Sequence, residues 1–266
     1  MKEIVNIFYN NYDRSEVVMN KVKKDFEEKG YEISLDYNPK AKYNVVIGGD
    51  GTFIKAVHDS NFSQIPFIGI NTGHLGFYQE VPIEETNSLL PLITQEKYCV
   101  DQLALLDCKV VTNDGKHEFL SLNEVVFKAK YTSIIHFDMY VNDVLLQSFA
   151  GDGIIFSTPS GSTAYNLSAG GAMLYQTLDG YQITPMAPIK SSIFRSLDKS
   201  LVVPSDTKIK LITRRREESF SSIGIDGMLQ EFENIKFIEI TMSDKKVNKM
   251  IFNKDWYWLN IKEKFL

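Results

Sequence analysis

The chain has 266 residues, with 29 Lys or Arg and 34 Asp or Glu, so its formal net charge is −5. Hydrophobic residues make up 44% and charged residues 24%, which is typical of a globular protein and excludes a disordered one. No run of 18 apolar residues predicts a membrane span. The acidic balance argues against sequence-independent binding of nucleic acid. Two isolated cysteines, Cys99 and Cys108, and a strand-like N-terminus without a signal-peptide pattern favour a reduced, cytoplasmic protein.

The N-terminal third alternates strand and helix patterns. Strands are predicted over residues 3–9, 31–37, 44–47 and 66–70. One helix is expected to begin at Asp13 as its N-cap, and a second to bury Phe53, Ile54 and Val57. Strands that alternate with helices predict a parallel sheet, so we expect an α/β domain over residues 1–98. Ligands of such a domain bind at the carboxyl ends of its strands.

Beyond residue 98 the period changes to short alternating runs. They are separated by the turn signals Asn113-Asp114-Gly115, Asn142-Asp143 and Asp226-Gly227. This pattern predicts an all-β domain of two packed antiparallel sheets, a β-sandwich, over residues 99–250. Residues 160–174, rich in Gly, Ala and Ser, interrupt it as a loop and a helix. The tail 251–266 holds Trp256 and Trp258, and their burial is expected to pack it back on the body.

A glycine loop follows directly after the buried strand at 44–47. It consists of Gly48, Gly49, Asp50, Gly51 and Thr52. Glycines permit close approach of a ligand and φ values that other residues resist, and the N–H groups of such a turn bind anions. A bare phosphate cradle would repel Asp50, whereas a site that also removes a proton or holds Mg²⁺ would use it. The alternative is a tight turn in which Asp50 forms an Asx-turn or caps the helix. Three glycines around an aspartate after a buried strand favour the functional interpretation.

Three further segments carry polar groups suited to a nucleotide. Gly151-Asp152-Gly153 precedes a hydroxyl-rich loop over residues 157–165, in which Tyr165 can stack on a planar ring. Asn123-Glu124 could bind adenine and ribose hydroxyls, although a solvated strand end is the better interpretation of an isolated pair. The loop at 71–77 fits close ligand approach and a plain turn equally well. No P-loop, G-x-G-x-x-G, protein-kinase or G-x-S-x-G motif is present.

In the order and spacing of these four segments the chain resembles the NAD kinase family, in its bacterial ATP-dependent form. The segments are Gly48 to Thr52, Asn71 to Phe77, Asn123-Glu124, and Gly151 to Tyr165. The resemblance implies an α/β domain followed by a β-sandwich. It also implies phosphorylation of the adenosine 2′-hydroxyl of NAD by ATP with Mg²⁺, giving NADP. The expected partners are NAD and ATP, with neither nucleic acid nor membrane, and the expected assembly is a homotetramer.

The resemblance also implies roles for individual residues. Asp50 corresponds to the general base, and the phosphate loop comprises Gly48, Gly49, Gly51 and Thr52. The residues implied to bind NAD are Asp50, Gly51, Phe77, Asn123, Glu124, Asp152, Ser160, Thr163, Ala164, Tyr165, Asn166, Leu167, Ser168 and Ala187. Of these, Asn123 and Thr163 would hold adenine, and Glu124 the ribose. Asp152, Ala164 and Ser168 would meet the nicotinamide end. No protein ligand is assigned to the metal.

Two other functions share parts of this pattern. A diacylglycerol- or sphingosine-type lipid kinase has the same Gly-Gly-Asp-Gly-Thr turn, but a lipid substrate offers no second nucleoside for the segment 152–165 to hold. A non-catalytic dinucleotide sensor would have no need of Asp50 as a base. The charged run 214–218 is interpreted as a solvated hairpin tip, because its glutamates offset its arginines.

Overall fold

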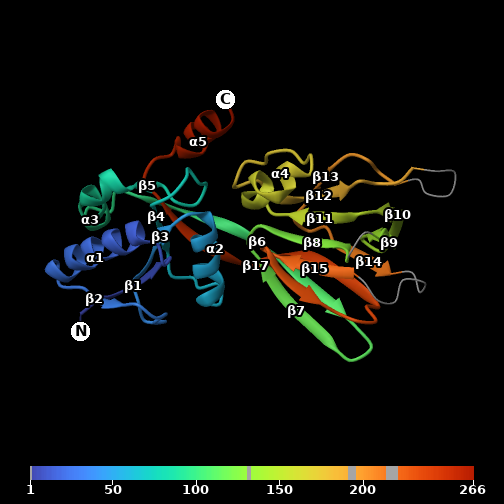
Figure 1. Ribbon diagram of the computed structural model, residues 1–266, viewed down its shortest axis with the longest axis horizontal. Coiled ribbons are helices and arrows are strands. Elements are labelled where there is room, and N and C mark those ends of the chain that lie inside the picture. Colours follow the sequence, from blue (N-terminus) through green and yellow to red (C-terminus); the bar gives the residue numbers. More distant parts are fainter. Residues whose placement is uncertain (1, 131–132, 191–195, 214–220) are drawn as a thin grey trace. The chain divides into compact units, whose positions relative to one another are not determined.

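The computed structural model describes residues 2–130, 133–190, 196–213 and 221–266 (Figure 1). The chain divides into two compact units, which we call the first unit (Met1–Gln102 with Lys246–Leu266) and the second unit (Leu103–Lys245). Two long strands, β6 (Cys99–Val111) and β17 (Phe237–Ile251), contribute residues to both units. The charged run interpreted as a hairpin tip lies outside the described residues.

The first unit is built on a parallel sheet. Its strands are β1 (Ile4–Tyr9), β2 (Glu32–Ser34), β3 (Tyr43–Gly48), β4 (Phe67–Asn71) and the short β5 (Val81–Pro82). They run in the order β5-β4-β3-β1-β2, and Lys249 of β17 pairs with Phe67 of β4. Every residue of β3 is buried, as its β-branched run predicts for a strand covered on both faces.

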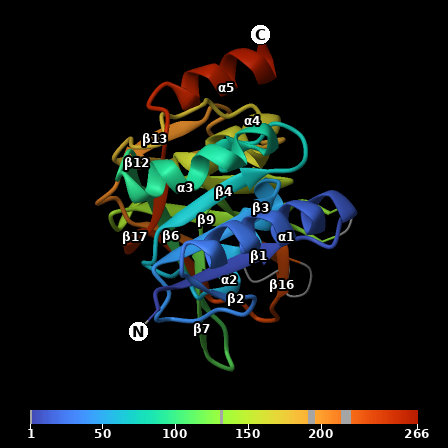
Figure 2. The same ribbon diagram turned by 90° about the vertical axis from the view of Figure 1, so that its left-hand side faces the viewer.

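Helices cover both faces of this sheet. The helices of the first unit are α1 (Asp13–Glu28), α2 (Asp50–Asp59), the 3₁₀ turn η1 (Ile83–Glu85), α3 (Thr86–Thr94) and α5 (Trp256–Phe265), of which α5 contacts the segment at residues 76–77. Figure 2 shows α1 and α3 in front of β1, β3 and β4, where they share one apolar cluster with Ile68 and Ile70 of β4. Side chains alternate along a strand, so Phe67 points to the opposite face, where its ring lies 5.5 Å from that of Phe53 in α2.

Local details of these helices differ from the sequence prediction. Asp13 is the first residue of α1 rather than its cap; the N-cap is Tyr12, and no side chain caps the helix. The carboxylate still suits this place, because the first turn carries the positive end of the helix dipole. In α2 the buried residues include Phe53 and Val57, whereas the predicted Ile54 is only half-buried.

The second unit contains two antiparallel sheets. One has the order β13-β12-β11-β8-β15-β16, with β8 (Glu124–Ala129), β11 (Gly153–Ser157), β12 (Gly180–Met186), β13 (Leu201–Pro204), β15 (Ser221–Ile225) and β16 (Met228–Glu231). The other runs β10-β9-β14-β17, with β6 beside β17 and β7 beside β6. Its remaining strands are β7 (Lys116–Ser121), β9 (Ile135–Val141), β10 (Val144–Gly151) and β14 (Ile209–Thr213).

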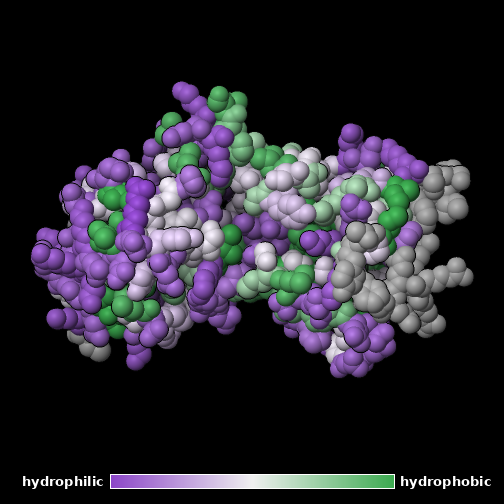
Figure 3. All heavy atoms as spheres, viewed as in Figure 1, coloured by the Kyte–Doolittle hydropathy of each residue, from purple (hydrophilic) through white to green (hydrophobic). Residues whose placement is uncertain are grey.

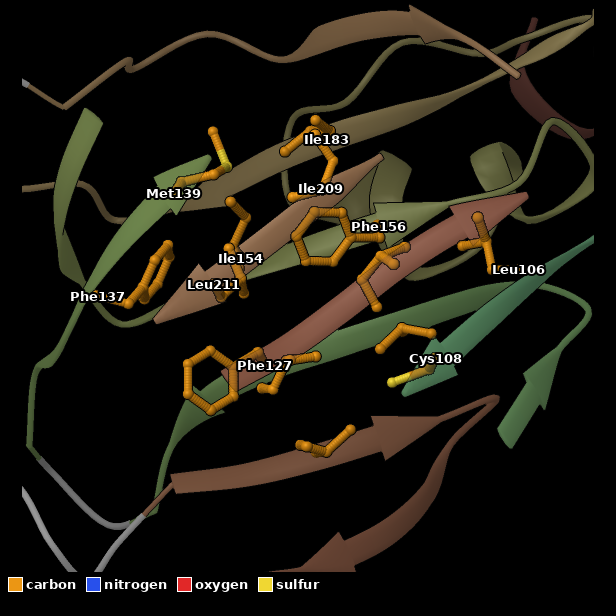
Figure 4. Packing of buried hydrophobic residues seen from close by; sticks show 14 of the residues in the cluster. Leu106, Cys108, Phe127, Phe137, Met139, Ile154, Phe156, Ile183, Ile209 and Leu211 are labelled. Carbon is orange, nitrogen blue, oxygen red and sulfur yellow. The ribbon is translucent and has the colours of Figure 1, made fainter. Parts of the chain in front are cut away.

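A single hydrophobic core lies between these two sheets. Phe127 and Phe156 enter it from one sheet and Phe137 from the other (Figure 4). The rings of Phe137 and Phe149 stack with centroids 4.7 Å apart. One shared core with side chains from both sheets is the arrangement of a β-sandwich, as predicted. The predicted interruption forms a short 3₁₀ turn η2 (Ser160–Thr163) and the one-turn helix α4 (Tyr165–Ser168).

The C-terminal segment forms α5 in the first unit, but not through burial of both tryptophans. Trp258 is 59% exposed, so the expectation is wrong for this residue; Tyr257 is buried in its place. Asn260 is buried as well, and its Nδ2 donates a hydrogen bond to the carbonyl of Gly76 at 2.7 Å. Some apolar side chains of α5 are exposed at the surface, although the face of the first unit seen in Figure 3 is mainly hydrophilic.

None of the helices described has both the length and the apolar composition that a bilayer crossing requires.

Candidate functional site

The carboxylate of Asp50 is held by two backbone N–H groups. Asp50 is the first residue of α2, directly after β3. Its Oδ2 accepts a hydrogen bond from the N–H of Phe77 and its Oδ1 one from the N–H of Tyr78, each at 3.0 Å. No side chain caps α2, whose N-cap residue is Gly49. The alternative of an Asx-turn or helix cap is therefore wrong, and the carboxylate is instead fixed against the segment that follows β4.

Gly76 leaves the space in which this carboxylate lies. A Cβ at position 76 would stand 2.3 Å from Oδ1 of Asp50, a distance that real contacts do not show. The segment is anchored from the other side by α5, because Asn260 binds the Gly76 carbonyl and the Phe77 ring stacks on Phe265 with centroids 6.2 Å apart. The side chain of Phe77 thus packs against α5, while its backbone N–H donates a hydrogen bond to Asp50.

The glycines of the loop provide space rather than unusual backbone angles. Gly49 and Gly51 have no atom within 4 Å of the place where a Cβ would be. A Cβ on Gly48 would meet Oγ1 of Thr52 at 2.3 Å. None of the three has a positive φ, so the expectation that they adopt backbone angles that other residues resist is wrong. The absence of side-chain atoms at Gly49 and Gly51 leaves space through which a phosphate group could approach the N-terminus of α2.

A buried cation, Lys249, lies behind the Asp50 segment. Its side chain is 1% exposed, and its Nζ donates to the carbonyl of Phe77 at 3.1 Å. Burial lowers the pKa of Lys249, and the charges of Glu80, Asp50 and Asp101 oppose that effect. Glu80 is 5% exposed, and burial raises its pKa against the opposing charge of Lys249. The backbone N–H groups of residues 252 and 253 donate to Oε1 of Glu80.

Sequence reasoning missed Lys249, although a signal for it existed. Val247, Lys249 and Ile251 are all buried at the end of β17, as is Met250 on the other face of the strand. A period of two places these three side chains on one face, so the lysine shares a buried face with two aliphatic residues. A lysine in such a position must be compensated by charge, which points to a partner carboxylate elsewhere.

In the second unit, Asp226 shapes the Asn123-Glu124 turn. One carboxylate oxygen accepts hydrogen bonds from the Ser121 hydroxyl at 2.6 Å and from the N–H groups of Asn123 and Glu124 at 2.7 and 3.1 Å. The other accepts one from the N–H of Leu122 at 2.7 Å. The pair Asp226-Gly227 has positive φ angles of 49° and 82° between β15 and β16, as a type I′ hairpin turn requires. Sequence reasoning used this pair as a turn signal, whereas its contact with residues 121–124 is visible only in the tertiary structure.

Glu124 is buried, so the interpretation as a solvated strand end is wrong. The residue is 7% exposed, and its Oε2 has no hydrogen-bond partner among the described residues. Burial, with a contribution from the negative charge of Asp226, raises its pKa to about 8. A buried carboxyl with an unused oxygen gains from a ligand that donates a hydrogen bond to it.

The hydroxyl-rich loop packs on the same turn. The N–H of Thr158 donates to the Asn123 carbonyl at 2.9 Å, and the Thr158 hydroxyl donates to the Leu122 carbonyl at 2.6 Å. A Cβ on Gly161 would stand 2.1 Å from the Asn123 carbonyl oxygen, so only glycine fits there. The hydroxyls of Ser160 and Thr158 lie 3.1 Å apart. The structure therefore brings Asn123, Glu124 and the start of this loop together.

The remaining predicted residues are distributed along β11. Glu124 pairs with Ser157 at one end of the strand, and Asp152 precedes Gly153 at the other. Four residue steps separate these ends, about 13 Å. α4 lies over the middle, because Asn166 accepts a hydrogen bond from Thr184, which pairs with Ile155.

These residues differ in how accessible they are. Asn166 is fully buried, and its amide also donates to the carbonyls of residues 162 and 172. These hydrogen bonds hold the backbone of the loop in place. Thr163, Ala164 and Leu167 are half-buried. The exposed members are Asp152, Tyr165, Ser168 and Ala187. Ala187 has a positive φ of 42°, which turns the chain after β12.

Within the described part of the chain, no three His, Cys, Asp or Glu residues are grouped so that they could hold a metal ion. What the structure does present is an aspartate fixed in a glycine loop at the end of a parallel strand. A β-sandwich with a buried carboxyl and a hydroxyl-rich loop accompanies it. These features suit an enzyme that transfers a phosphoryl group to a small, nucleotide-like substrate, as the resemblance implies.

Comparison with known proteins identifies the family. The ATP-NAD kinase N-terminal domain matches residues 8–98, and the ATP-NAD kinase C-terminal domain matches residues 122–251. The chain therefore belongs to the NAD kinase family. Because both matches are to NAD kinase domains, the alternative of a lipid kinase is not supported.

Relatives and solved structures agree with this assignment. The NAD kinase of Finegoldia magna is 46% identical over 99% of this chain and 98% of its own. NAD kinase 1 of Listeria monocytogenes is 33% identical over 88% of this chain and 90% of its own. The fold is similar to that of yeast NADH kinase complexed with NADH, with a TM-score of 0.84 at 18% identity, covering 99% of this chain and 87% of that one. It is also similar to an Archaeoglobus fulgidus NAD kinase in complex with ATP, with a TM-score of 0.76 at 22% identity and coverage of 97% and 98%. The predicted fold class is thus confirmed.

Proposed function

We propose that this chain transfers the terminal phosphoryl group of ATP to the adenosine 2′-hydroxyl of NAD and releases NADP and ADP. The observation that carries the proposal is the carboxylate of Asp50, which two backbone N–H groups fix in the glycine loop of an NAD kinase family member. Phosphoryl transfer depends mainly on positioning and on neutralisation of charge, with one group that orients the nucleophile.

Asp50 is proposed as the general base. Each of its oxygens accepts one hydrogen bond from the backbone and retains a further lone pair for a substrate hydroxyl. As the 2′-oxygen forms its bond to phosphorus, its proton passes to Asp50 and the bond from phosphorus to the ADP oxygen breaks. The open space beside Gly49 and Gly51 is proposed to admit the phosphates of the substrates. Thr52, in the same turn, is proposed to belong to this phosphate loop.

The second unit is proposed to hold the dinucleotide. Asn123 and Thr163 bind adenine, and Glu124 accepts hydrogen bonds from ribose hydroxyls. The unused Oε2 of Glu124 supports this role. Tyr165 packs on a ring. The nicotinamide end is proposed to meet Asp152, Ala164, Ser168 and the backbone of Ala187. The distribution of these residues along β11 suits a ligand with two nucleosides.

The remaining components of the proposal rest on the resemblance and on chemistry. Mg²⁺ is proposed to arrive with ATP, because it usually keeps several waters and binds through substrate phosphates; when bound it would neutralise phosphate charge. The enzyme is proposed to act in the cytoplasm and as a homotetramer. A light-scattering mass of four chains is the expected result for the assembly, and a monomeric mass would contradict it.

The test is direct. The purified chain is incubated with NAD, ATP and Mg²⁺, and NADP is measured with an NADP-dependent dehydrogenase. Asp50→Asn should bind NAD with nearly unchanged affinity and lose at least about 99% of turnover, since removal of a general base costs roughly 10²–10⁴-fold. Asp59→Asn, an exposed aspartate at the other end of α2, is the matched control and should keep normal turnover. Binding of NAD by the unaltered chain without formation of NADP would instead identify a non-catalytic sensor.

A further inference from the structure

A cavity in the first unit lies apart from the proposed site residues. Its volume is about 330 Å³, and it is bordered by η1, α3 and the start of α5. Apolar side chains form much of its wall, among them Leu89, Leu92 and Leu259. This size is at the lower end of the range for small-molecule pockets, which start at about 300 Å³.

Two buried polar atoms of the wall have no hydrogen-bond partner among the described residues. They are Oε2 of Glu80 and Nε1 of Trp256. Glu80 is 5% exposed, and its other oxygen already accepts the backbone N–H of Phe252 at 2.8 Å. A buried polar atom without a partner is unfavourable, so a ligand that supplies hydrogen bonds to both atoms gains from each.

The charge of the cavity wall is negative. Glu80 and Glu85 both line it, and the described residues of the wall include no lysine or arginine. Lys249 offsets part of the charge of Glu80, and burial raises the pKa of Glu80; a cation bound beside this carboxyl would favour its ionised form. The rings of Phe252 and Trp256 border the same space. Aromatic faces together with carboxylates favour an organic cation over an anion or a neutral hydrocarbon.

We propose that this cavity binds a small organic ammonium compound that also carries an oxygen acceptor, such as an amino alcohol with an apolar body. The ammonium group donates to Oε2 of Glu80, and the hydroxyl oxygen accepts from Nε1–H of Trp256. The apolar body contacts the leucines of the wall. The proposal does not depend on the phosphorylation of NAD.

The two tryptophans allow a sharp test. Both lie in α5, but only Trp256 lines the cavity, and Trp258 is exposed. The indole N–H resonances of the ¹⁵N-labelled full-length chain are assigned with Trp258→Phe and followed during titration with phenylalaninol. We expect a saturable shift of the Trp256 resonance with a Kd of about 1 mM or lower, and no shift of Trp258. N-acetylphenylalaninol, which lacks the cation, should bind at least about tenfold more weakly.

Variants identify the carboxylate. Glu80→Gln should weaken phenylalaninol binding about tenfold or more, whereas Glu84→Gln, an exposed neighbour outside the cavity wall, should leave it unchanged. The comparison of phenylalaninol with its acetylated form uses the unaltered chain, so it stands even if Glu80→Gln fails to fold. The proposal is overturned if the Trp256 resonance does not move at about 10 mM phenylalaninol, which is ten times the expected Kd, or if the acetylated compound binds equally well.

Discussion

Replacement of Lys249 by methionine tests how the first unit tolerates a buried charge. The substitution keeps the length of the side chain but removes its cation. It leaves Glu80, which is 5% exposed, without its nearby positive charge, and it removes the hydrogen bond to the Phe77 carbonyl. Loss of one partner of a buried charge pair costs about 3–5 kcal/mol. Glu80 and Lys249 are coupled through space without a direct hydrogen bond, so we expect the lower end, about 3 kcal/mol.

The unfolding of the first unit can be observed directly. The chain has two tryptophans, and both lie in α5 of this unit, so their fluorescence in urea reports its unfolding. Lys254→Met, an exposed lysine in the adjacent turn, should change the free energy of unfolding by less than about 0.5 kcal/mol. The double variant Lys249→Met with Glu80→Gln should recover about 1–2 kcal/mol of the single loss, because neither charge is then left alone.

The same substitution should affect turnover. Lys249 donates a hydrogen bond to the carbonyl of Phe77, and the N–H of Phe77 donates one to Asp50. Loss of the cation should therefore make the orientation of the Asp50 carboxylate less fixed. We expect kcat to fall by about tenfold or more, with a smaller change in KM. If Lys249→Met unfolds within about 1 kcal/mol of the unaltered chain, which is an ordinary effect of a single substitution, the buried charge does not stabilise the unit and the reasoning is refuted.

Three further predictions follow from the local geometry. Gly76→Ala should reduce kcat by about 100-fold and lower the free energy of unfolding by about 1–3 kcal/mol, because its Cβ would displace the Asp50 carboxylate from the N–H groups of Phe77 and Tyr78; normal turnover would exclude the fixed orientation of Asp50. Asp226→Ala should destabilise the chain by about 3–5 kcal/mol and weaken NAD binding, since four donors of residues 121–124 lose their acceptor; circular dichroism melting and calorimetric titration measure both, and an unchanged NAD affinity would contradict the role of this turn. Glu124, with a pKa raised to about 8, binds its proton more tightly when folded, so its contribution to stability is complete below pH 4.5 and is lost as the pH rises through 8. The shift corresponds to at most about 5 kcal/mol, so the stability of the unaltered chain relative to Glu124→Gln should fall over that window, and a constant difference would refute the raised pKa.

The class of fold could be predicted because hydrophobic period is a local property of the sequence. The β-branched run before Gly48 becomes the fully buried β3, and the alternating runs after residue 98 become the two sheets of the second unit. Asp226-Gly227 forms its hairpin turn for the same reason, since positive φ is a local preference of these residue types.

The details that depend on packing could not be predicted in this way. Burial of Tyr257 rather than Trp258 is decided by which face of α5 meets the rest of the unit. The glycines at 48, 49 and 51 suggested unusual backbone angles, but their φ values are ordinary, and their role is the space that they leave. Such space is defined by neighbours that are distant in the chain.

By itself, the sequence determined the alternation of elements, the place of Asp50 at a strand end and the family resemblance, because each of these is written in residues a few positions apart. Only the tertiary structure decided what holds the chemistry in place. The hydrogen bonds from residues 77 and 78 to Asp50, the buried pair of Lys249 and Glu80, and the turn held by Asp226 join residues that lie between 27 and 169 positions apart. Their energies arise from desolvation and from hydrogen bonds that exist only once the chain has brought these groups together.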